Sequence, residues 1–377
     1  MSRIVGSDRT GPVGVGLIGA GNISAQYLTN LVRLPDVRVV IVGDLATEVA
    51  AARAAEFGIP EHGDAAAVLA HPDVEIVVNL TIPAAHVAVS QQAVAAGKHV
   101  WTEKPLGTEL GAAAELLEQA AAAGVLVGCA PDTLLGSGFR ASRNLVEDGS
   151  VGTVTSAVTM MQGPGPESWH PSPEFLFARG GGPVLDIGPY YFTALVQLFG
   201  PVRRVMALGS TAFATRTIGS GPKAGQQFPV EVPTAVSALL QFADGGFATT
   251  VFSFESPQSR HGFVEITGTD ATLVVPDPNA HVGASTVVIA DGEPREVDAA
   301  TANAGGDVGR GVGVVDLARA IRTGSPQHAS GELGLHVLDI MLSIEQAVAS
   351  AEPVTLTTTT SRPPALPTEW NPAASTL

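Results

Sequence analysis

The sequence predicts an α/β protein that begins with a doubly wound parallel sheet and continues with mostly antiparallel strands. Short β-branched runs alternate with helical patterns up to about residue 130, and β patterns dominate after about residue 150. Strand–helix alternation is typical of a parallel sheet with helices on both faces. The length of 377 residues suits two domains. We expect them to cover residues 1–130 and 131–377.

In the first part, each predicted strand is followed by a helix. The strands are expected at Val13–Ile18, Val37–Val42, Ile76–Leu80, His99–Thr102 and Val125–Cys129. The helices are expected at Asn22–Leu34, Thr47–Phe57, Ala65–Ala70, Ala84–Ala96 and Leu110–Ala123. Pro35, Gly58, Gly97 and Gly124 stand just past helix ends, where such residues stop a helix.

In the second part, alternating β patterns predict a mostly antiparallel sheet. The expected strands are Val154–Met161, Val202–Leu208, Ala235–Phe242, Phe247–Phe254, Phe263–Thr267 and Val287–Ile289. Asp244-Gly245-Gly246 separates two of these runs and predicts a hairpin. Helices are expected at Gly138–Glu147, Tyr190–Leu198, Val314–Arg322 and Leu335–Ser350. The Thr- and Pro-rich tail from Thr355 is expected to form a surface strap.

Composition excludes several classes of function. The 20 basic and 36 acidic residues give a net charge of −16, which disfavours nucleic acids and anionic membranes as partners. The single cysteine, Cys129, cannot form an intramolecular disulfide, and the scattered histidines show no metal-binding spacing. Met1–Pro12 has no signal-peptide pattern, and no apolar run reaches the length of a membrane span. We expect a cytoplasmic protein without a bound metal.

A glycine-rich turn links the first strand to the first helix. Gly19 permits a tight turn and Gly21 lets the backbone approach a pyrophosphate, which would sit at the helix N-terminus with Asn22 and Ile23. Ser24 takes the place of the third glycine of the G-x-G-x-x-G pattern and is small enough for close packing. The alternative is a chance glycine-rich turn, but the strand before it and the helix after it favour a dinucleotide site.

Asp44 ends the next strand, 23 residues beyond Gly21. This spacing is typical of the carboxylate that binds a ribose 2′-hydroxyl, and a carboxylate repels a 2′-phosphate. NAD is therefore favoured over NADP, which stays possible. Without the glycine turn, Asp44 would be interpreted as a solvated strand end.

Two further stretches carry residues suited to proton chemistry. Glu103-Lys104-Pro105 follows the fourth strand, and the Lys104 ammonium could orient a hydroxyl and lower the pKa of a neighbouring acid. On spacing alone, Lys104 would be a surface lysine. Asp186 and Tyr190 follow a glycine-rich loop and share one face if the segment is helical. A nearby cation would make Tyr190 a usable base. Their structural alternatives are a helix N-cap and a core residue.

Four residues are candidates for substrate contacts. Trp169 and His170 lie on a Pro-rich loop, and a Trp face can pack on the C–H groups of a sugar, although such a pair is more often structural. Asp132 lies just past the fifth strand, and Arg310 lies within Gly309-Arg310-Gly311.

Taken together, these motifs resemble those of the glucose–fructose oxidoreductase, inositol dehydrogenase and MocA-like (Gfo/Idh/MocA) oxidoreductase family. The matching segments are Gly19–Ser24, Thr81-Ile82-Pro83 with His86, Ala95–Val100 running into Glu103-Lys104-Pro105, and Gly180–Tyr190. The resemblance covers nearly the whole chain. The combination is specific, although each motif alone is not.

The resemblance implies a Rossmann domain followed by an α/β domain with a large open sheet, which usually forms the oligomer interface. A homodimer or homotetramer through the C-terminal sheet is therefore expected. The family lysine maps onto Lys104 and the family aspartate onto Asp186. The residues implied to border the dinucleotide are Thr81, Ile82, Pro83, His86, Glu103 and Lys104.

The chain departs from the resemblance at the expected acid/base. Many members have His where this chain has Tyr190, and Asp where it has Thr193. The His–Asp pair of the inositol dehydrogenase type is therefore missing. Tyr at this position is more similar to the glucose–fructose oxidoreductase and dihydrodiol dehydrogenase branches.

The expected activity is NAD(P)-linked hydride transfer at a hydroxyl or keto carbon of a sugar, polyol or related compound. One alternative is an enzyme that keeps NAD tightly bound and uses transient oxidation for elimination or epimerisation. A second alternative is a non-catalytic dinucleotide-binding regulator on the same fold. Lys104, Asp186 and Tyr190 are all present, which favours an enzyme.

Overall fold

The computed structural model describes residues 9–297 and 309–377, so most of the N-terminal segment Met1–Pro12 lies outside the described residues. The chain forms two compact units. The first contains residues 1–140, 300–335 and 363–377, and the second contains residues 141–299 and 336–362. The sequence predicted one boundary at residue 130, whereas these units are not continuous along the chain. Two late segments, residues 300–335 and 363–377, belong to the first unit.

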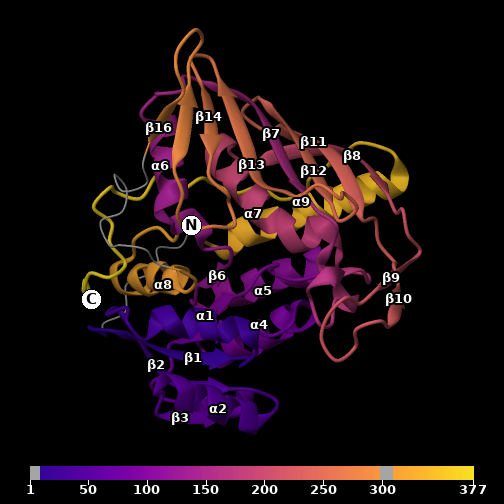
Figure 1. Ribbon diagram of the computed structural model, residues 1–377. Coiled ribbons are helices and arrows are strands. Elements are labelled where there is room, and N and C mark those ends of the chain that lie inside the picture. Colours follow the sequence, from indigo (N-terminus) through magenta and orange to yellow (C-terminus); the bar gives the residue numbers. More distant parts are fainter. Residues whose placement is uncertain (1–8, 298–308) are drawn as a thin grey trace. The chain divides into compact units, whose positions relative to one another are not determined.

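The first unit contains a parallel sheet of six strands (Figure 1). They are β1 (Val13–Ile18), β2 (Val37–Gly43), β3 (Glu61–Gly63), β4 (Ile76–Asn79), β5 (His99–Thr102) and β6 (Val127–Cys129). Their order, β3-β2-β1-β4-β5-β6, reverses direction between β1 and β4. In such doubly wound sheets, ligands bind at the carboxyl ends of the strands beside this reversal. The predicted fold of this part is confirmed.

Helices pack against this sheet, and one of them comes from late in the sequence. They are α1 (Asn22–Leu31), α2 (Thr47–Phe57), α3 (Ala65–Ala70), α4 (His86–Ala95), α5 (Leu110–Ala123) and α8 (Val312–Thr323). The backbone of α8 approaches the sheet so closely that a Cβ on Gly313 would lie 2.0 Å from the Trp101 ring. Glycine is therefore required there, since no larger residue would fit without moving the helix.

The C-terminal tail is anchored to the first unit. The buried Asp36 carboxylate accepts hydrogen bonds from Thr376 N (2.8 Å) and Oγ1 (2.6 Å) and from Arg319 Nε (2.8 Å). Arg140 donates to the carbonyl oxygen of Pro367 at 2.7 Å, and its guanidinium stacks over the Trp370 ring. The predicted strap is thus held by charged hydrogen bonds, which are stronger than neutral ones.

The second unit contains a nine-stranded sheet, in which all strand pairs are antiparallel except β7 with β12. The strands are β7 (Val154–Gln162), β8 (Val202–Ser210), β11 (Ala235–Phe242), β12 (Phe247–Ser253), β13 (Arg260–Gly268), β14 (Thr272–Val275), β15 (Ser285–Val288), β16 (Arg295–Val297) and β17 (Val354–Thr355). Gly245 and Gly246 have positive φ, so they close the predicted β11–β12 hairpin. A small separate sheet pairs β9 (Thr215–Thr217) with β10 (Gln227–Pro229).

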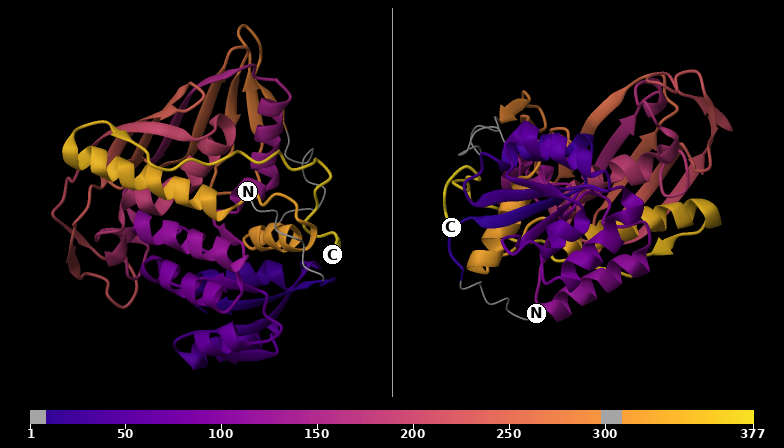
Figure 2. Two further views of the ribbon diagram at one scale, coloured as in Figure 1. Left: turned by 180° about the vertical axis from the view of Figure 1, so that it is seen from behind. Right: turned by 90° about the horizontal axis from the view of Figure 1, so that it is seen from below.

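Helices α6 (Ser137–Glu147), α7 (Gly182–Phe199) and α9 (Gly331–Ser350) complete the fold. Helix α7 lies on strands β7, β11 and β12. A Cβ on Gly188 of α7 would lie 3.4 Å from the Sδ of Met341, which belongs to α9, the yellow-orange helix in Figure 2. Helix α7 begins eight residues before the predicted start at Tyr190. Pro183 belongs to its first turn, where the missing N–H costs nothing.

Helix α9 is, among the described residues, long and apolar enough to cross a membrane, and the sequence prediction had found no such span. More than half of its apolar window is buried, at 56%. A core helix of a soluble protein has the same properties, so this helix is weak evidence for a membrane span.

Candidate functional site

The first unit presents a glycine turn whose geometry fits a dinucleotide pyrophosphate. Gly19 has φ +104°, and a Cβ there would lie 2.6 Å from the Leu80 carbonyl oxygen. Nothing lies within 4 Å of a Cβ built on Gly21, the N-cap of α1, which has no side-chain hydrogen bond. The first N–H groups of a helix attract an anion, and the space above Gly21 lets one approach.

Asp44 lies directly beside this turn. Its Oδ2 accepts a hydrogen bond from Ala20 N at 2.7 Å, and its Oδ1 accepts one from Ala46 N at 3.0 Å. Arg53 of α2 approaches the same turn, with Nη2 3.4 Å from the Gly21 carbonyl oxygen. The half-buried Asp44 carboxylate is thus held where it can meet a ribose hydroxyl. This donor and acceptor set fits NAD.

The loop after β4 lies on the other side of the strand-order reversal. Asn79, which is fully buried, accepts hydrogen bonds from Thr81 Oγ1 (2.7 Å) and Thr81 N (3.2 Å). Ile82 next to it is 69% exposed, an unusual position for a large apolar side chain. An exposed apolar residue on an ordered loop at this edge is well placed to pack on a flat ring of a cofactor. The dinucleotide contacts predicted for Thr81, Ile82 and Pro83 stay predictions.

His86 connects two loops within the protein. Its Nδ1 lies 2.6 Å from the Pro105 carbonyl oxygen, and its Nε2 lies 3.0 Å from that of Thr81. Burial lowers the pKa of His86, so the ring is neutral near pH 7 and donates only one of these two hydrogen bonds. With 1% exposure, His86 holds the Thr81 loop against the Pro105 loop. A direct cofactor contact by His86 is therefore not supported.

Glu103 organises the segment that carries Lys104. Its Oε1 accepts a hydrogen bond from Tyr27 Oη at 2.8 Å, and its Oε2 accepts one from Lys104 N at 3.0 Å. Trp101 Nε1 donates to Tyr27 Oη at 3.1 Å. Burial, followed by the charge of Glu103, raises the pKa of Tyr27 well above its ordinary value. Tyr27 is therefore a permanent donor, and Glu103 positions the half-buried Lys104.

Arg310 and Asp132 lie near this network rather than in a common substrate pocket. Arg310 Nη1 is 3.9 Å from Glu103 Oε1, so its charge lies near the carboxylate that positions Lys104. Asp132 is fully buried, and its Oδ2 accepts hydrogen bonds from Gly311 N (2.8 Å) and Gly313 N (3.1 Å). This carboxylate stabilises the start of α8. We therefore assign Asp132 to the helix terminus instead of the substrate.

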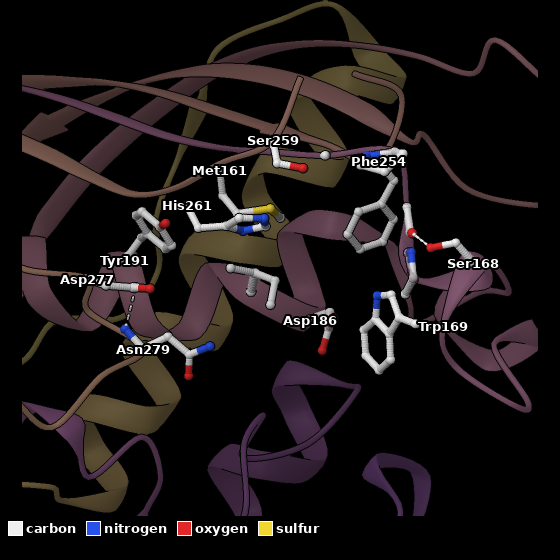
Figure 3. Close-up of a pocket in the computed structure, with 15 residues that line it drawn as sticks. Met161, Ser168, Trp169, Asp186, Tyr191, Phe254, Ser259, His261, Asp277 and Asn279 are labelled. Atoms are coloured by element: carbon white, nitrogen blue, oxygen red, sulfur yellow. Dashed lines mark hydrogen bonds between the residues drawn. The ribbon is translucent and has the colours of Figure 1, made fainter. Parts of the chain in front are cut away.

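The second unit contains a cavity of about 290 Å³ (Figure 3). Trp169 and Phe254 lie together on one side of it, with Ser168 and Asp186 close to Trp169. Tyr191, Asp277 and Asn279 lie on the opposite side. The described residues that line it are Met161, Gly163, Pro164, Gly165, Pro166, Ser168, Trp169, Asp186, Ile187, Tyr191, Phe254, Ser259, His261, Asp277 and Asn279.

Of the predicted pair Trp169 and His170, only Trp169 lines the cavity. Trp169 lines the cavity and is 67% exposed, whereas His170 is not among the lining residues. The His170 Nδ1 accepts a hydrogen bond from Ser172 N at 3.0 Å, and its ring contacts that of Trp169 edge-on. His170 therefore supports Trp169, and its predicted substrate contact is not supported.

The loop that carries Trp169 is fixed by the neighbouring β9–β10 segment. Arg216 Nη1 pairs with Glu167 Oε1 at 2.5 Å, and Arg216 Nη2 donates to the Phe254 carbonyl oxygen at 3.0 Å. Ser220 Oγ donates to the Trp169 carbonyl oxygen at 2.7 Å. The arginine is buried, so this ion pair is well protected from solvent. Trp169 is thus presented on a rigid support.

Helix α7 contributes Asp186 to the cavity. Asp186 and Tyr190 both belong to this helix, which confirms the helical segment that the sequence left conditional. Tyr190 is 4% exposed and is not a lining residue, whereas its neighbour Tyr191 is one. The catalytic role of Tyr190 stays a prediction.

Sequence reasoning missed the polar side of the cavity. Tyr191, His261, Asp277 and Asn279 come from α7, β13 and the segment after β14. Gly262 N donates to Tyr191 Oη at 2.8 Å, which joins two of these elements. Only the pairing of β13 with β7 and β14 brings these residues together. Local sequence patterns give no indication of this strand pairing.

Comparisons with known proteins agree with the fold. Residues 13–130 match the model of an oxidoreductase family with an NAD-binding Rossmann fold, and residues 139–274 match the GFO/IDH/MocA C-terminal domain. A 1,5-anhydro-D-fructose reductase from Ensifer adhaerens is 28% identical over 289 residues, which are 74% of this chain and 81% of the relative.

Two solved structures share the fold at low sequence identity. An NAD-binding oxidoreductase from Klebsiella pneumoniae aligns with a TM-score of 0.82 and 21% identity, covering 92% of this chain and 100% of that one. A levoglucosan dehydrogenase in complex with NADH and levoglucosan aligns with a TM-score of 0.80 and 20% identity, also covering 92% and 100%.

Proposed function

Because the chain belongs to the GFO/IDH/MocA family of NAD-binding oxidoreductases, we propose that it transfers a hydride at a hydroxyl or keto carbon of a sugar or polyol. The observation that carries this proposal is the cavity of the second unit, where a carboxylate, Asp186, and an exposed indole, Trp169, line the same space. An indole face packs on sugar C–H groups, and carboxylates accept hydrogen bonds from hydroxyls. The similarity to a 1,5-anhydro-D-fructose reductase supports the same substrate class.

The cofactor in this proposal is NAD, held by the Gly19–Ser24 turn and by Asp44. When bound, NAD supplies a nicotinamide that accepts or donates a hydride. The Asp44 carboxylate disfavours the 2′-phosphate of NADP. Ile82 packs on the cofactor from the loop after β4.

The chemical roles fall to three residues. Lys104, held through its backbone N–H by Glu103, orients the substrate hydroxyl and favours its ionised form. Tyr190 moves the proton to or from this oxygen, and Asp186 fixes the substrate by accepting a hydroxyl hydrogen bond. Holding the reacting groups in this way lowers the entropic part of the barrier.

Substitution of Lys104 tests the proposal. Lys104→Ala should reduce kcat by about 100-fold or more, as expected for loss of a positioned proton-transfer group, and should leave NADH affinity unchanged. Turnover is followed by NADH absorbance with a panel of neutral sugars and polyols. Lys223→Ala is the matched control, because Lys223 is exposed and pairs with Glu174, and neither residue lines the cavity. Full activity of Lys104→Ala would refute the assignment.

We also propose that the outer face of the large sheet joins copies of this chain into a dimer or tetramer. Met206 of β8 pairs with Leu239 of β11, and both side chains are exposed, at 41% and 48%. Leu208, 73% exposed, and Phe247, 55% exposed, extend this apolar surface along β8 and β12. Exposed apolar surface of this kind marks interaction sites.

A further inference from the structure

The cavity of the second unit carries negative charges on its lining. Asp186 and Asp277 both line it, and none of the lining residues within the described part of the chain is a lysine or an arginine. His261, on β13, also lines the cavity. An anionic group placed beside Asp277 would therefore meet a carboxylate and no lysine or arginine from the lining.

Asp277 is held in place by the backbone around it. Its Oδ1 accepts a hydrogen bond from Asn279 N at 2.9 Å. A Cβ on Gly262 would lie 2.6 Å from the Asp277 Cβ, so Asp277 packs directly against the β13 backbone. Gly262 has φ +68°, a conformation that also favours glycine. The carboxylate has little freedom to turn away from an incoming charge.

The charge of Asp277 also affects the pKa of a second lining residue, Tyr191. Burial raises the pKa of Tyr191, and the negative charge of Asp277 raises it further. Tyr191 Oη also accepts a hydrogen bond from Gly262 N at 2.8 Å, so the phenol is fixed on the same side as Asp277. This side of the cavity thus presents a neutral hydroxyl and a carboxylate, which are partners for sugar hydroxyls.

The opposite side carries two aromatic rings. Trp169 and Phe254 lie together there, across the cavity from Asp277 and Asn279 (Figure 3). A ligand that matches both sides has a C–H face and an edge of hydroxyl groups. The volume of about 290 Å³ is just below the range of about 300–1,000 Å³ for ligand pockets, which favours a small ligand.

Resting on the proposed function, we propose that this cavity admits an uncharged, monosaccharide-sized substrate and rejects sugars that carry a carboxylate or phosphate. Asp277 is the specificity-determining residue. Rejection follows because Asp277 repels an anionic group placed beside it, and the cavity lining supplies no lysine or arginine there to compensate. Asn279 beside it contributes hydrogen bonding without charge.

Matched sugar pairs test this specificity. The cofactor-loaded enzyme is assayed with D-glucose, D-glucuronate and D-glucose 6-phosphate, and with D-galactose and D-galacturonate. Binding of each sugar is measured separately by isothermal titration calorimetry in the presence of NADH. We expect the uronates to be at least about 100-fold poorer than their hexoses, as two like charges at close range in a partly buried site would produce.

Asp277→Asn should raise uronate binding and kcat/KM about 10-fold relative to the hexose, since the shape is retained and one charge is lost. Asp244→Asn, at the exposed β11–β12 turn, is the control with the same change of charge. Asn279→Asp adds a charge beside Asp277 and should further lower binding and kcat/KM for the uronate relative to the hexose. That variant decides the question if Asp277→Asn does not fold.

The two hypotheses fail in different ways. If the hexoses bind but no sugar is turned over, the proposed function is wrong, and the binding ratios still decide the role of Asp277. Equal binding of uronate and hexose, failure of both hexoses to bind, or a ratio that does not respond to Asp277→Asn or Asn279→Asp would overturn the inference.

Discussion

The substitution Asp44→Asn separates two effects of one carboxylate at the glycine turn. Asp44 accepts backbone hydrogen bonds at both oxygens, from Ala20 N at 2.7 Å and from Ala46 N at 3.0 Å. An asparagine offers only one carbonyl oxygen, and its amide group faces the other N–H as a second donor. The substitution therefore loosens the turn and also removes the charge that opposes a 2′-phosphate.

The structure sets the size of each effect. Loss of one hydrogen bond to a charged acceptor costs about 1.5–3 kcal/mol, which corresponds to a roughly 10- to 100-fold weaker affinity for NADH. Two charges 4 Å apart repel by about 1 kcal/mol in water and about 4 kcal/mol near a protein surface. Since Asp44 is half-buried, its removal should shift the NADPH-to-NADH affinity ratio by about 10- to 100-fold toward NADPH. Arg53, with Nη2 3.5 Å from the Ala20 carbonyl oxygen, adds positive charge at this turn.

Fluorescence titration of both reduced cofactors measures these constants directly. Glu118→Gln on the exposed side of α5 is the control, because it removes one negative charge from the same unit far along the chain from the turn. If Asp44→Asn leaves both the NADH affinity and the cofactor ratio unchanged, Asp44 does not bind the ribose and the cofactor reasoning is refuted.

Three more predictions address the substrate, stability and assembly. Trp169→Ala should raise KM for the sugar about 10-fold with little change in kcat, because the indole face contributes to ground-state binding; an unchanged KM would remove Trp169 from the site. Burial raises the pKa of Glu75, but the hydrogen bonds and charge of Arg322 outweigh it and hold that pKa below its ordinary value. This stabilisation is present above the unfolded pKa and is lost as pH falls through the folded one. Arg322→Met should therefore have a lower Tm than wild type at pH 7, and in calorimetric scans the difference in Tm should shrink as pH falls below the ordinary pKa of glutamate. Leu239→Glu should reduce the oligomer mass in light scattering while Tm stays the same, and an unaltered mass would exclude this face as the interface.

The sequence predicted the first unit well because its signals are local. Val13–Ile18, Gly19 and Asn22 form a strand, a turn and a helix start within ten residues, and each is recognisable without its neighbours in space. Helix α7 shows the limit of such signals. Gly182 and Pro183 were interpreted as a loop, although proline in the first turn is compatible with a helix.

Candidate site residues could be predicted where they belong to one local motif. They were missed where the packing of several segments brings them together. The glycine turn and Asp44 directly follow the adjacent strands β1 and β2, so spacing alone related them. Asp277 reaches the cavity only through the packing of Gly262 and the pairing of β13 with β14. Asp132 had the expected residue type near a strand end, but its carboxylate is used by the N–H groups of Gly311 and Gly313.

The close fit of Gly313 on Trp101 has a consequence for how the chain is synthesised. Trp101 leaves the ribosome more than 200 residues before the helix that covers it. Until then, the apolar surface around Trp101 must stay unshielded or be bound by other factors, since a growing chain folds from its N-terminus at about 5–20 residues per second. A fragment that stops at residue 140 should therefore aggregate when expressed alone, and adding residues 309–335 in trans should restore its solubility.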